Sequence, residues 1–508
     1  MKKICALLLC VALLLCGCGV GNSGLNPTTP TYFGDTNDVK PGGNTQGVQA
    51  LSLIYDPTEQ LNPYKSENTA NRALFSLIYQ GLFSVNRDYD AEPVLCERYS
   101  VTADLKTYTF YLANAMFSDG TQVTANDVVA SLTTAMESRW YGGRLQQVKS
   151  ISASGAAVVI ELKTPMAELP VLLDIPVVKA TEVKAARPLG TGPYRLEVSN
   201  QEASLRRQSA WWCQAELPVY GDVIPLIQGE SPAQIRDAFE FEGVSLVVSD
   251  PGSDRYADFR SDYELWSAEN GKFLYLVCNE KSKIFSDPAI RRALTHAINR
   301  ELLAEEYYHG IARPASLPAS PSSPWYNSSL AQRFSYAPEL FAEAVAAAEL
   351  VENSITILLN GDDVVRHRAG LAIADMLRAG GLKVSIIKSS AEDLVENLKY
   401  TEYDLYLGQT KLSANMDISA FFGTYTALNY GGLADPALYQ LSLDAMTNAG
   451  NFYKLHESVM EEGQLCPILF QSNAVFVKRG MLQNLAPARD GVFHYSLGRT
   501  LEDALIEE

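Results

Sequence analysis

Residues 355–407 read ITILLNGDDVVRHRAGLAIADMLRAGGLKVSIIKSSAEDLVENLKYTEYDLYL, and this pattern indicates the fold class. Short apolar runs alternate with segments in which apolar residues recur at helical spacing. Gly380 and Gly381 end the longer helical segment, and Ser389 with Glu392 forms a capping-box pattern that begins the shorter one. We predict strands at 355–359, 383–387 and 403–407, and helices at 364–378 and 389–398. Because this alternation with short joins is typical of a parallel sheet covered by helices, the C-terminal half is predicted to hold an α/β domain.

The sequence on either side of this stretch carries further element signals. Asp287 and Pro288 supply an N-cap and a first-turn proline for one helix, which Gly310 would end. In the N-terminal half the patterns predict a strand at 49–55, a helix at 68–83, a strand at 107–112 and a helix after the capping box of Thr124 and Asp127.

Composition excludes several classes of function. The chain has 508 residues, a net charge of −18 and 5 histidines. Nucleic-acid binding needs clustered Lys and Arg that release counterions, so this acidic balance argues against it. The scarcity of histidine argues against a His-rich metal centre. An apolar content of 47% argues against wholesale disorder, and the length allows two or three domains.

The first residues read as an export signal. Lys2 and Lys3 precede an apolar run at 4–16, which as a helix would rise roughly 20 Å, too short to cross a bilayer comfortably. The run ends in LCGC at 15–18, which resembles a bacterial lipobox, and ordinary signal cleavage nearby is the alternative. We predict a lipoprotein signal peptide at 1–17, a lipidated Cys18 and a flexible Gly/Asn/Thr/Pro-rich tether to residue 47. The protein would then be anchored on the extracytoplasmic face of a bacterial membrane.

Four cysteines would remain in the folded body after that cleavage, namely Cys96, Cys213, Cys278 and Cys466. They are widely spaced and form no CxxC pair. In an exported protein they allow three disulfide connectivities, between which the sequence does not choose. Small buried thiols are the equal alternative.

Sequence signatures of common enzymes are missing. There is no HExxH, no GxSxG, no GxxxxGK[ST] and no GxGxxG after a strand. Ser385 and Lys388 match SxxK, but they fall inside a predicted strand without the partner motifs. We predict a protein without enzymatic activity, without a cofactor and without a metal.

Several motifs occur in an order that resembles extracellular solute-binding protein family 5, the oligopeptide- and dipeptide-binding lipoproteins of ABC importers. In chain order they are NPY at 62–64, LIYQGLF at 77–83, LKTYTFYL at 105–112, FSDGT at 117–121, VTANDVV at 123–129, GTGPYRL at 190–196, FSDPAIRRALTHAINR at 285–300 and NYGG at 429–432 followed by Asp435-Pro436. Each match alone is weak, and their shared order behind a lipobox carries the resemblance.

The resemblance implies a bilobed α/β fold, like that of periplasmic binding proteins, with an extra subdomain in the N-terminal lobe. Lobe I would take residues 48–70, 185–272 and 474–508, the extra subdomain 71–184 and lobe II 273–473. A family member closes on its solute by hinge motion and delivers it to the membrane permease, so the implied partners are a peptide or other small solute and ABC permease subunits. We expect a monomer.

The family's ligand-binding positions can be transferred to a few residues. Trp140 and Tyr141 lie where the family often places an aromatic wall, a surface or core aromatic pair being the alternative. The cleft segment of lobe II falls at 408–417, GQTKLSANMD, where peptide binders commonly carry a Trp and an acid for the ligand's amino terminus. Here that segment instead supplies the candidates Lys411, Ser413, Asn415 and Asp417.

Lys411 would favour a negatively charged ligand group if it points into the cleft. Asn429 and Tyr430 of the later family motif complete the candidate ligand-binding set. The resemblance therefore implies a transport receptor for a peptide-like solute, and nickel, another cargo of the family, is disfavoured by the few histidines. An exported lipoprotein that signals or assists another protein without import is the alternative.

Overall fold

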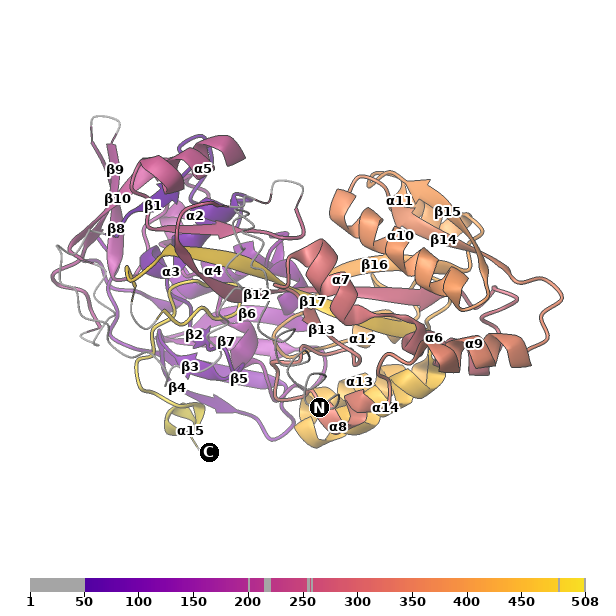
Figure 1. The fold of residues 1–508 in the computed structure, drawn as a ribbon. Coiled ribbons are helices and arrows are strands. Elements are labelled where there is room, and N and C mark those ends of the chain that lie inside the picture. Colours follow the sequence, from indigo (N-terminus) through magenta and orange to yellow (C-terminus); the bar gives the residue numbers. More distant parts are fainter. Residues whose placement is uncertain are drawn as a thin grey trace, which may run out of the picture.

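The computed structural model describes residues 51–199, 202–213, 221–253, 256, 259–482 and 485–506. It has two halves, joined by the long strands β12 (Tyr263–Cys278) and β17 (Leu465–Lys478) that run between them (Figure 1). The N-terminal half holds the elements before β12, and the C-terminal half holds those between β12 and β17. The predicted signal peptide, tether and Cys18 lie outside the described residues. Among the described helices none has the length and apolar character that a membrane span needs.

One mixed sheet extends through both halves. In spatial order its strands are β15 (Lys383–Ser389), β14 (Ser354–Asn360), β16 (Leu405–Lys411), β12, β17, β11 (Leu246–Ser249), β1 (Leu53–Tyr55), β10 (Val223–Gln228), β9 (Glu202–Arg207) and β8 (Tyr194–Ser199), while β13 (Arg313–Pro314) pairs with β17. Since β12 and β17 lie at the centre and pair antiparallel, they connect the part of the sheet in each half.

The α/β prediction for the C-terminal half is confirmed. Strands β15 and β16 both pair parallel with β14. Helix α10 (Val364–Ala379) packs against β14 and β15, and α11 (Leu394–Tyr400) precedes β16. The predicted capping box of Ser389 and Glu392 is wrong, because β15 continues through Ser389. The Ser390 hydroxyl instead donates to Asp393 Oδ2 at 2.7 Å, one residue further along.

The single helix predicted between Asp287 and Gly310 is also wrong. Ile298 adopts an extended conformation and separates α6 (Pro288–Ala297) from α7 (Arg300–Tyr308). The Asn299 side chain accepts from the Leu302 N–H at 3.0 Å and so caps the second helix. The predicted N-cap at Asp287 is present, and His309 and Gly310 both take a positive φ where α7 ends.

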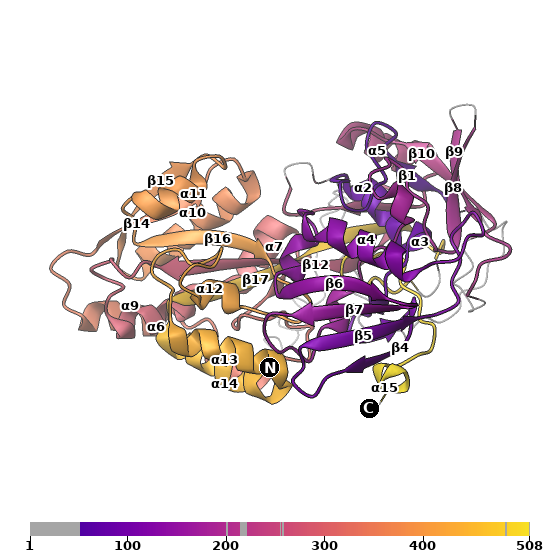
Figure 2. The same ribbon diagram turned by 180° about the vertical axis from the view of Figure 1, so that it is seen from behind.

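The other helices of the C-terminal half surround this sheet. They are α8 (Ser328–Gln332), α9 (Pro338–Ala347), α12 (Ser419–Phe422), α13 (Pro436–Thr447) and α14 (Phe452–Glu462). Seen from behind, α13 and α14 lie below β16 and β12 and beside the four-stranded sheet that residues 96–162 of the N-terminal half form (Figure 2).

The N-terminal half contains two further sheets. They comprise a hairpin of β2 (Phe83–Val85) and β3 (Ala91–Pro93), and a four-stranded sheet in the order β4 (Cys96–Val101), β5 (Thr107–Leu112), β7 (Ala157–Leu162) and β6 (Val148–Ser154). Helix α4 (Ala125–Met136) packs against β6 and β7 (Figure 2). The Asp127 carboxylate accepts from the Thr124 N–H at 2.9 Å, as the predicted capping box requires.

The remaining α-helices of this half have four to ten residues. They are α2 (Thr69–Ala73), α3 (Phe75–Ile78), α5 (Pro232–Phe241) and α15 (Leu501–Ala504). The helix predicted at 68–83 is thus wrong in extent, because it is divided at Leu74 and ends at Ile78. The segment after β17 returns to this half, where α15 packs against β4 (Figure 1).

All four cysteines of the folded body are free thiols. Cys96, Cys278 and Cys466 are buried among apolar side chains, and Cys213 is half-buried. The structure therefore supports the buried-thiol alternative rather than a disulfide framework.

Candidate functional site

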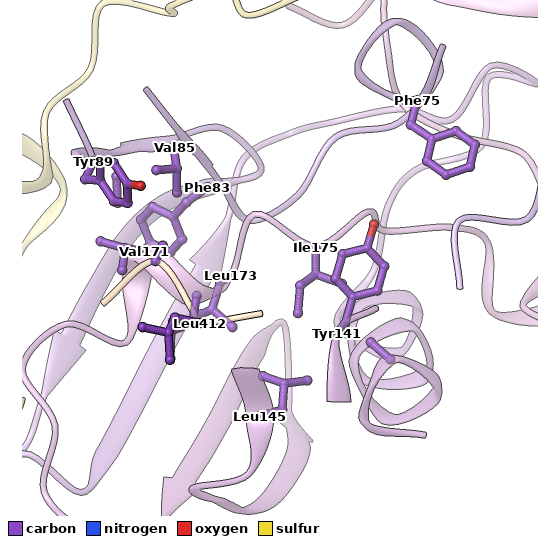
Figure 3. Close-up of a cluster of buried hydrophobic side chains, with 14 of the residues drawn as sticks. Phe75, Phe83, Val85, Tyr89, Tyr141, Leu145, Val171, Leu173, Ile175 and Leu412 are labelled. Carbon is purple, nitrogen blue, oxygen red and sulfur yellow. The ribbon is translucent and has the colours of Figure 1, made fainter. Parts of the chain in front are cut away.

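The two halves meet where β16 ends. Leu412, directly after the strand, is buried and lies beside Leu173 of the N-terminal half (Figure 3). Its N–H donates to the Gly271 carbonyl of β12 at 3.0 Å, and its own carbonyl accepts from Arg489 Nη2. The segment after β16 thus touches both a central strand and the chain after β17.

Five charged side chains gather at this junction, and we call them the charged cluster: Arg144, Asp174, Lys411, Arg489 and Asp490. Asp490 lies at its centre, with Oδ1 at 2.5 Å from Lys411 Nζ and Oδ2 at 2.6 Å from Arg144 Nη2. Arg489 Nε is 3.7 Å from Asp490 Oδ2, and Arg144 pairs on its other side with Asp174. One loop carboxylate therefore holds a lysine of the C-terminal half and an arginine of the N-terminal half.

The backbone positions Asp490 for these contacts. Its φ is 60°, in the left-handed region, and Gly491 follows, as is typical of an Asp-Gly turn. The Asp490 N–H donates to the Glu269 carbonyl at 2.9 Å, which ties the loop to β12.

Gly271 of β12 makes room for Arg489. The register between β12 and β17 shifts between Glu269 and Phe273, and Gly271 within this irregular stretch has a φ of +71°. A Cβ there would lie 2.2 Å from Arg489 Nη2 and 3.0 Å from the Leu412 oxygen. Glycine is thus needed both for its backbone angle and for the close approach of the guanidinium.

Burial and neighbouring charge shift the titration of the cluster. Burial, together with Arg144 and Arg489, lowers the pKa of Lys411 to about 8, although Asp490 opposes this shift. Burial alone would raise the pKa of Asp490, but Lys411, Arg144 and Arg489 outweigh it and hold that pKa well below its usual range. Asp490 is therefore a carboxylate at neutral pH.

Trp140 and Tyr141, the predicted aromatic wall, lie beside the cluster. The Trp140 ring faces two cations, with Arg72 Cζ at 3.9 Å and Lys411 Nζ at 5.6 Å from its centroid. Tyr141 is buried, and its hydroxyl oxygen accepts from Arg72 Nη2 at 3.4 Å. The structure thus brings Trp140, Tyr141 and Lys411 together.

A cavity of about 130 Å³ adjoins the charged cluster, and we call it the cluster cavity. Its walls come from the N-terminal half and from the segment after β17. Six of its lining residues belong to the charged cluster or lie beside it: Arg72, Tyr141, Arg144, Asp174, Arg489 and Asp490. Apolar and aromatic side chains, among them Phe75, Phe83, Val85 and Phe493, form much of the rest of its lining.

The other candidates of the segment after β16 face different partners. Asn415 is buried, with Nδ2 at 3.3 Å from the Met446 sulfur, and the Ser413 hydroxyl donates to Asn415 Oδ1 at 2.9 Å. Asp417 accepts from the Ser419 N–H at 2.8 Å, and burial raises its pKa. None of the three lines the cluster cavity, so in this arrangement they order the loop. Trp140 and Lys411 do not line it either, and of the predicted residues Tyr141 does.

Asn429 and Tyr430 lie elsewhere. They line a second cavity of about 860 Å³, the distal cavity, formed with residues 279–284 and 398–404. In the β12–β16 ladder Lys272 pairs with Lys411 and Cys278 with Leu405, so the two cavities lie at opposite ends of these strands. The Asn429 side chain donates to the Gly423 carbonyl at 3.0 Å. The structure therefore does not bring these two residues to the charged cluster.

Sequence reasoning missed Arg72, Arg144, Asp174, Arg489 and Asp490. Arg144 and Asp490 are 346 positions apart, so no local spacing could connect them. The dipeptide Asp490-Gly491 was the one local signal, since it marks a tight turn. Within the described residues, no group of three or more His, Cys, Asp or Glu side chains is placed to hold a metal ion.

The model of bacterial extracellular solute-binding proteins, family 5 (middle part), matches residues 90–431. The chain belongs to this family. The resemblance predicted from the motifs is thus confirmed.

Among curated proteins, the glutathione-binding protein GsiB of Escherichia coli strain K12 is 28% identical over 312 residues, which are 58% of this chain and 59% of GsiB. GsiB of Salmonella typhimurium strain LT2 is 28% identical over 288 residues, 52% of this chain and 54% of that protein. The chain thus matches these relatives over less than two thirds of their length, and they are binding proteins.

Solved structures share the fold over nearly the whole body. A putative peptide binding protein, AppA from Clostridium difficile, has a TM-score of 0.70 at 15% identity, covering 89% of this chain and 99% of that one. The periplasmic murein tripeptide binding protein MppA, in its unliganded open form, has a TM-score of 0.70 at 16% identity, covering 86% and 95%. The predicted bilobed α/β fold is confirmed.

Proposed function

We propose that this protein is the solute-binding component of an ABC importer, which captures a peptide-like solute between two lobes and delivers it to the permease. The junction at Lys411 and Asp490 is the observation that carries the proposal. There, side chains from both halves meet beside the cluster cavity, while β12 and β17 connect the two halves. Hinge closure on a ligand needs this arrangement.

The ligands of two similar proteins favour a peptide-like solute for this protein. GsiB is a glutathione-binding protein and MppA a murein tripeptide binding protein, and both ligands are short peptides. A receptor of this kind needs no catalytic residues, which agrees with the absence of enzyme motifs from the sequence. The candidate ligand contacts nearest the cavity are Trp140, Tyr141 and Lys411.

We assign the lobes as the motifs suggested. Lobe I comprises 48–70, 185–272 and 474–508, the extra subdomain 71–184 and lobe II 273–473. The bounds at 272 and 474 fall inside β12 and β17, the two strands that run between the halves. The four-stranded sheet of β4, β5, β7 and β6 falls within the extra subdomain.

Membrane attachment is the other part of the proposal. Cleavage after residue 17 would leave a lipidated Cys18, a tether to residue 47 and a monomeric receptor on the extracytoplasmic face. Metabolic labelling with radioactive palmitate tests this. We expect label in the wild-type chain and none in Cys18→Ala, and label retained in Cys18→Ala would contradict the assignment.

Thermal-shift screening of the purified mature protein tests the ligand class. The screen would use short peptides, amino-acid derivatives, sugars and metal ions. A ligand at a thousand times its Kd stabilises the folded protein by about 4 kcal/mol, which is a clear rise in Tm. We expect a peptide to give this rise. If a sugar or a metal ion raises Tm and no peptide does, the peptide assignment fails.

A further inference from the structure

Glu269 of β12 receives hydrogen bonds from both halves of the molecule. Its Oε2 accepts from the Tyr89 hydroxyl of the N-terminal half and, at 2.9 Å, from the Ser320 hydroxyl of the C-terminal half. Its Oε1 accepts from the same serine at 3.0 Å and lies 3.2 Å from Arg313 Nε. Because the Glu269 side chain is only 9% exposed, these groups replace most of its contact with water. One buried carboxylate thus joins the two halves, and we call Tyr89, Glu269 and Ser320 the hinge lock.

The hinge lock lies at the irregular stretch of β12. Glu269 pairs with Ser472 of β17, and the next regular pair is Phe273 with Phe470, so the register shifts between them. An interruption of the ladder lets the strand bend there, whereas hydrogen bonds from Glu269 to lobe II resist that bend. As the lobes are assigned, Glu269 is in lobe I and Ser320 in lobe II. The hinge lock therefore spans the place where closure would bend the molecule.

Tyr89 reaches Glu269 from the tip of the β2–β3 hairpin, in a conformation that tyrosine rarely adopts. Its φ is 70°, and its N–H donates to the Asn86 carbonyl at 3.2 Å. The buried ring meets Trp325 of the C-terminal half edge-on, with the centroids 6.2 Å apart. Burial, and to a lesser extent Glu269, raises the pKa of Tyr89 well above its usual value, so the hydroxyl keeps its proton and donates. An unfavourable backbone angle thus directs a neutral donor to the hinge.

Two more residues with a positive φ lie at the same place. Among the described residues, six other than glycine have such an angle, and Tyr89, Met416 and Asp490 are three of them. The Asp490 N–H donates to the Glu269 carbonyl at 2.9 Å, and the Ser320 N–H donates to the Met416 sulfur at 3.5 Å. Such conformations persist only where surrounding contacts hold them, and they gather at switch regions. Their concentration around Glu269 indicates a junction that changes conformation.

We infer that Tyr89 is a positioning residue for lobe closure: by sharing Glu269 with Ser320 it holds the two halves together across the hinge and sets how often the lobes open. This role rests on the proposed function of solute capture, and Tyr89 acts in it through Glu269 rather than through the solute. The apparent affinity for a solute falls in proportion as the closed form is less populated. A lock made of the protein's own groups therefore controls how long a captured solute stays, whatever the chemistry of that solute.

Amide hydrogen exchange of the full-length mature protein, followed by mass spectrometry, tests the hinge lock. The reporter is Ala167, whose N–H donates to the Met446 carbonyl of the C-terminal half at 2.8 Å. Since Ala167 follows β7 and not the β2–β3 hairpin, its exchange rises when the halves separate and not when the hairpin alone loosens. Tyr89→Phe removes only the hydroxyl. We expect exchange at Ala167 to become at least about tenfold faster in this variant, because a hydrogen bond to a charged group is lost.

Two further variants complete the test. Ser320→Ala removes the lobe II donor to the same carboxylate and should also speed exchange at Ala167, so it remains informative if Tyr89→Phe folds poorly. The matched control is Tyr194→Phe. It removes another buried tyrosine hydroxyl, which donates to the Gly221 carbonyl at 2.7 Å within the N-terminal half, and exchange at Ala167 should stay as in the wild type.

Three results would overturn the hinge lock. They are unchanged exchange at Ala167 in either folded variant, faster exchange confined to residues 83–93 in Tyr89→Phe, and exchange at Ala167 that rises equally in Tyr194→Phe. The measurement uses no solute, so each of these results leaves the transport function standing. That function fails separately, if no solute of the thermal-shift screen raises Tm.

Discussion

The two ends of β16 present opposite kinds of site. At its start, the Asp404 carboxylate accepts from the Thr356 N–H at 2.8 Å and from the Ser282 hydroxyl, and it lines the distal cavity of about 860 Å³. At its end, Lys411 joins the charged cluster beside a cavity of about 130 Å³. The Asp404 carboxylate thus stays within the C-terminal half, whereas the Asp490 carboxylate pairs with Lys411 of one half and Arg144 of the other. Contact between the halves, rather than cavity volume, therefore distinguishes the two ends of the strand.

The largest expected difference between the two ends is in the free energy of unfolding after the carboxylate at each end is replaced by an amide. Asp490→Asn leaves Arg144, Lys411 and Arg489 without their main counter-charge, and breaking a buried ion pair costs about 3–5 kcal/mol. Asp404→Asn keeps an oxygen acceptor for Thr356 and should cost about 1 kcal/mol. Urea unfolding of both variants measures the free energies. A loss in Asp490→Asn no larger than that in Asp404→Asn would show that the cluster does not hold the halves together.

Two glycines with the same backbone angle allow a matched steric test. Gly271 beside the charged cluster and Gly431 beside the distal cavity both have a φ of +71°. A Cβ on Gly431 would meet Val277 Cγ1 at 3.3 Å, whereas one on Gly271 would lie 2.2 Å from Arg489 Nη2. Alanine at either position costs about 1–2 kcal/mol for the backbone, and overpacking adds a further ~1–3 kcal/mol only at Gly271.

Thermal unfolding of Gly271→Ala and Gly431→Ala measures this difference. We expect the larger fall in Tm for Gly271→Ala. Equal falls in Tm would mean that Arg489 can move away from Gly271 at little cost, so that the hydrogen bond from Arg489 to the Leu412 carbonyl contributes little to stability.

The next largest expected effect is on the pH dependence of the free energy of unfolding, which should differ between the two ends of β16. The pKa of Lys411 is lowered from 10.5 to about 8 in the folded state, chiefly by burial. Between pH 8 and 10.5 the unfolded chain therefore binds more protons than the folded one, so stability rises with pH across this window. Because the side chain is 26% exposed, we expect a gain of about 1–2 kcal/mol.

Lys411→Met should remove this rise. Lys281→Met, at the distal cavity, is the control and should keep it. Urea unfolding at pH 7.5 and pH 10 measures both variants against the wild type. If the free energy of unfolding still rises with pH in Lys411→Met, another titrating group causes the rise.

The parts of the fold that local sequence specifies were predictable. The strands and helices of 355–407 follow from apolar spacing, and the capping box at Thr124 follows from residues three apart. The division of 287–310 was not predicted, because Ile298 continues the apolar stripe while Asn299 also suits an N-cap. Trp140 contacts Lys411, while its role as part of a ligand-binding wall stays a prediction. The arginines and Asp490 could not be found from spacing, since they meet only when segments hundreds of residues apart fold together.

The smallest expected effect concerns Asn429, which the family motif placed among the ligand contacts and the structure places at the distal cavity. Its side chain donates to the Gly423 carbonyl at 3.0 Å, in a half-buried loop. Asn429→Ala should therefore cost about 0.5–1.5 kcal/mol of stability and change the affinity for the bound solute less than twofold. Urea unfolding measures the stability, and calorimetry with the tightest ligand of the thermal-shift screen compares the affinity of Asn429→Ala with that of the wild type. A tenfold loss of affinity in folded Asn429→Ala would place ligand contacts at both ends of β16 and remove the distinction between the two cavities.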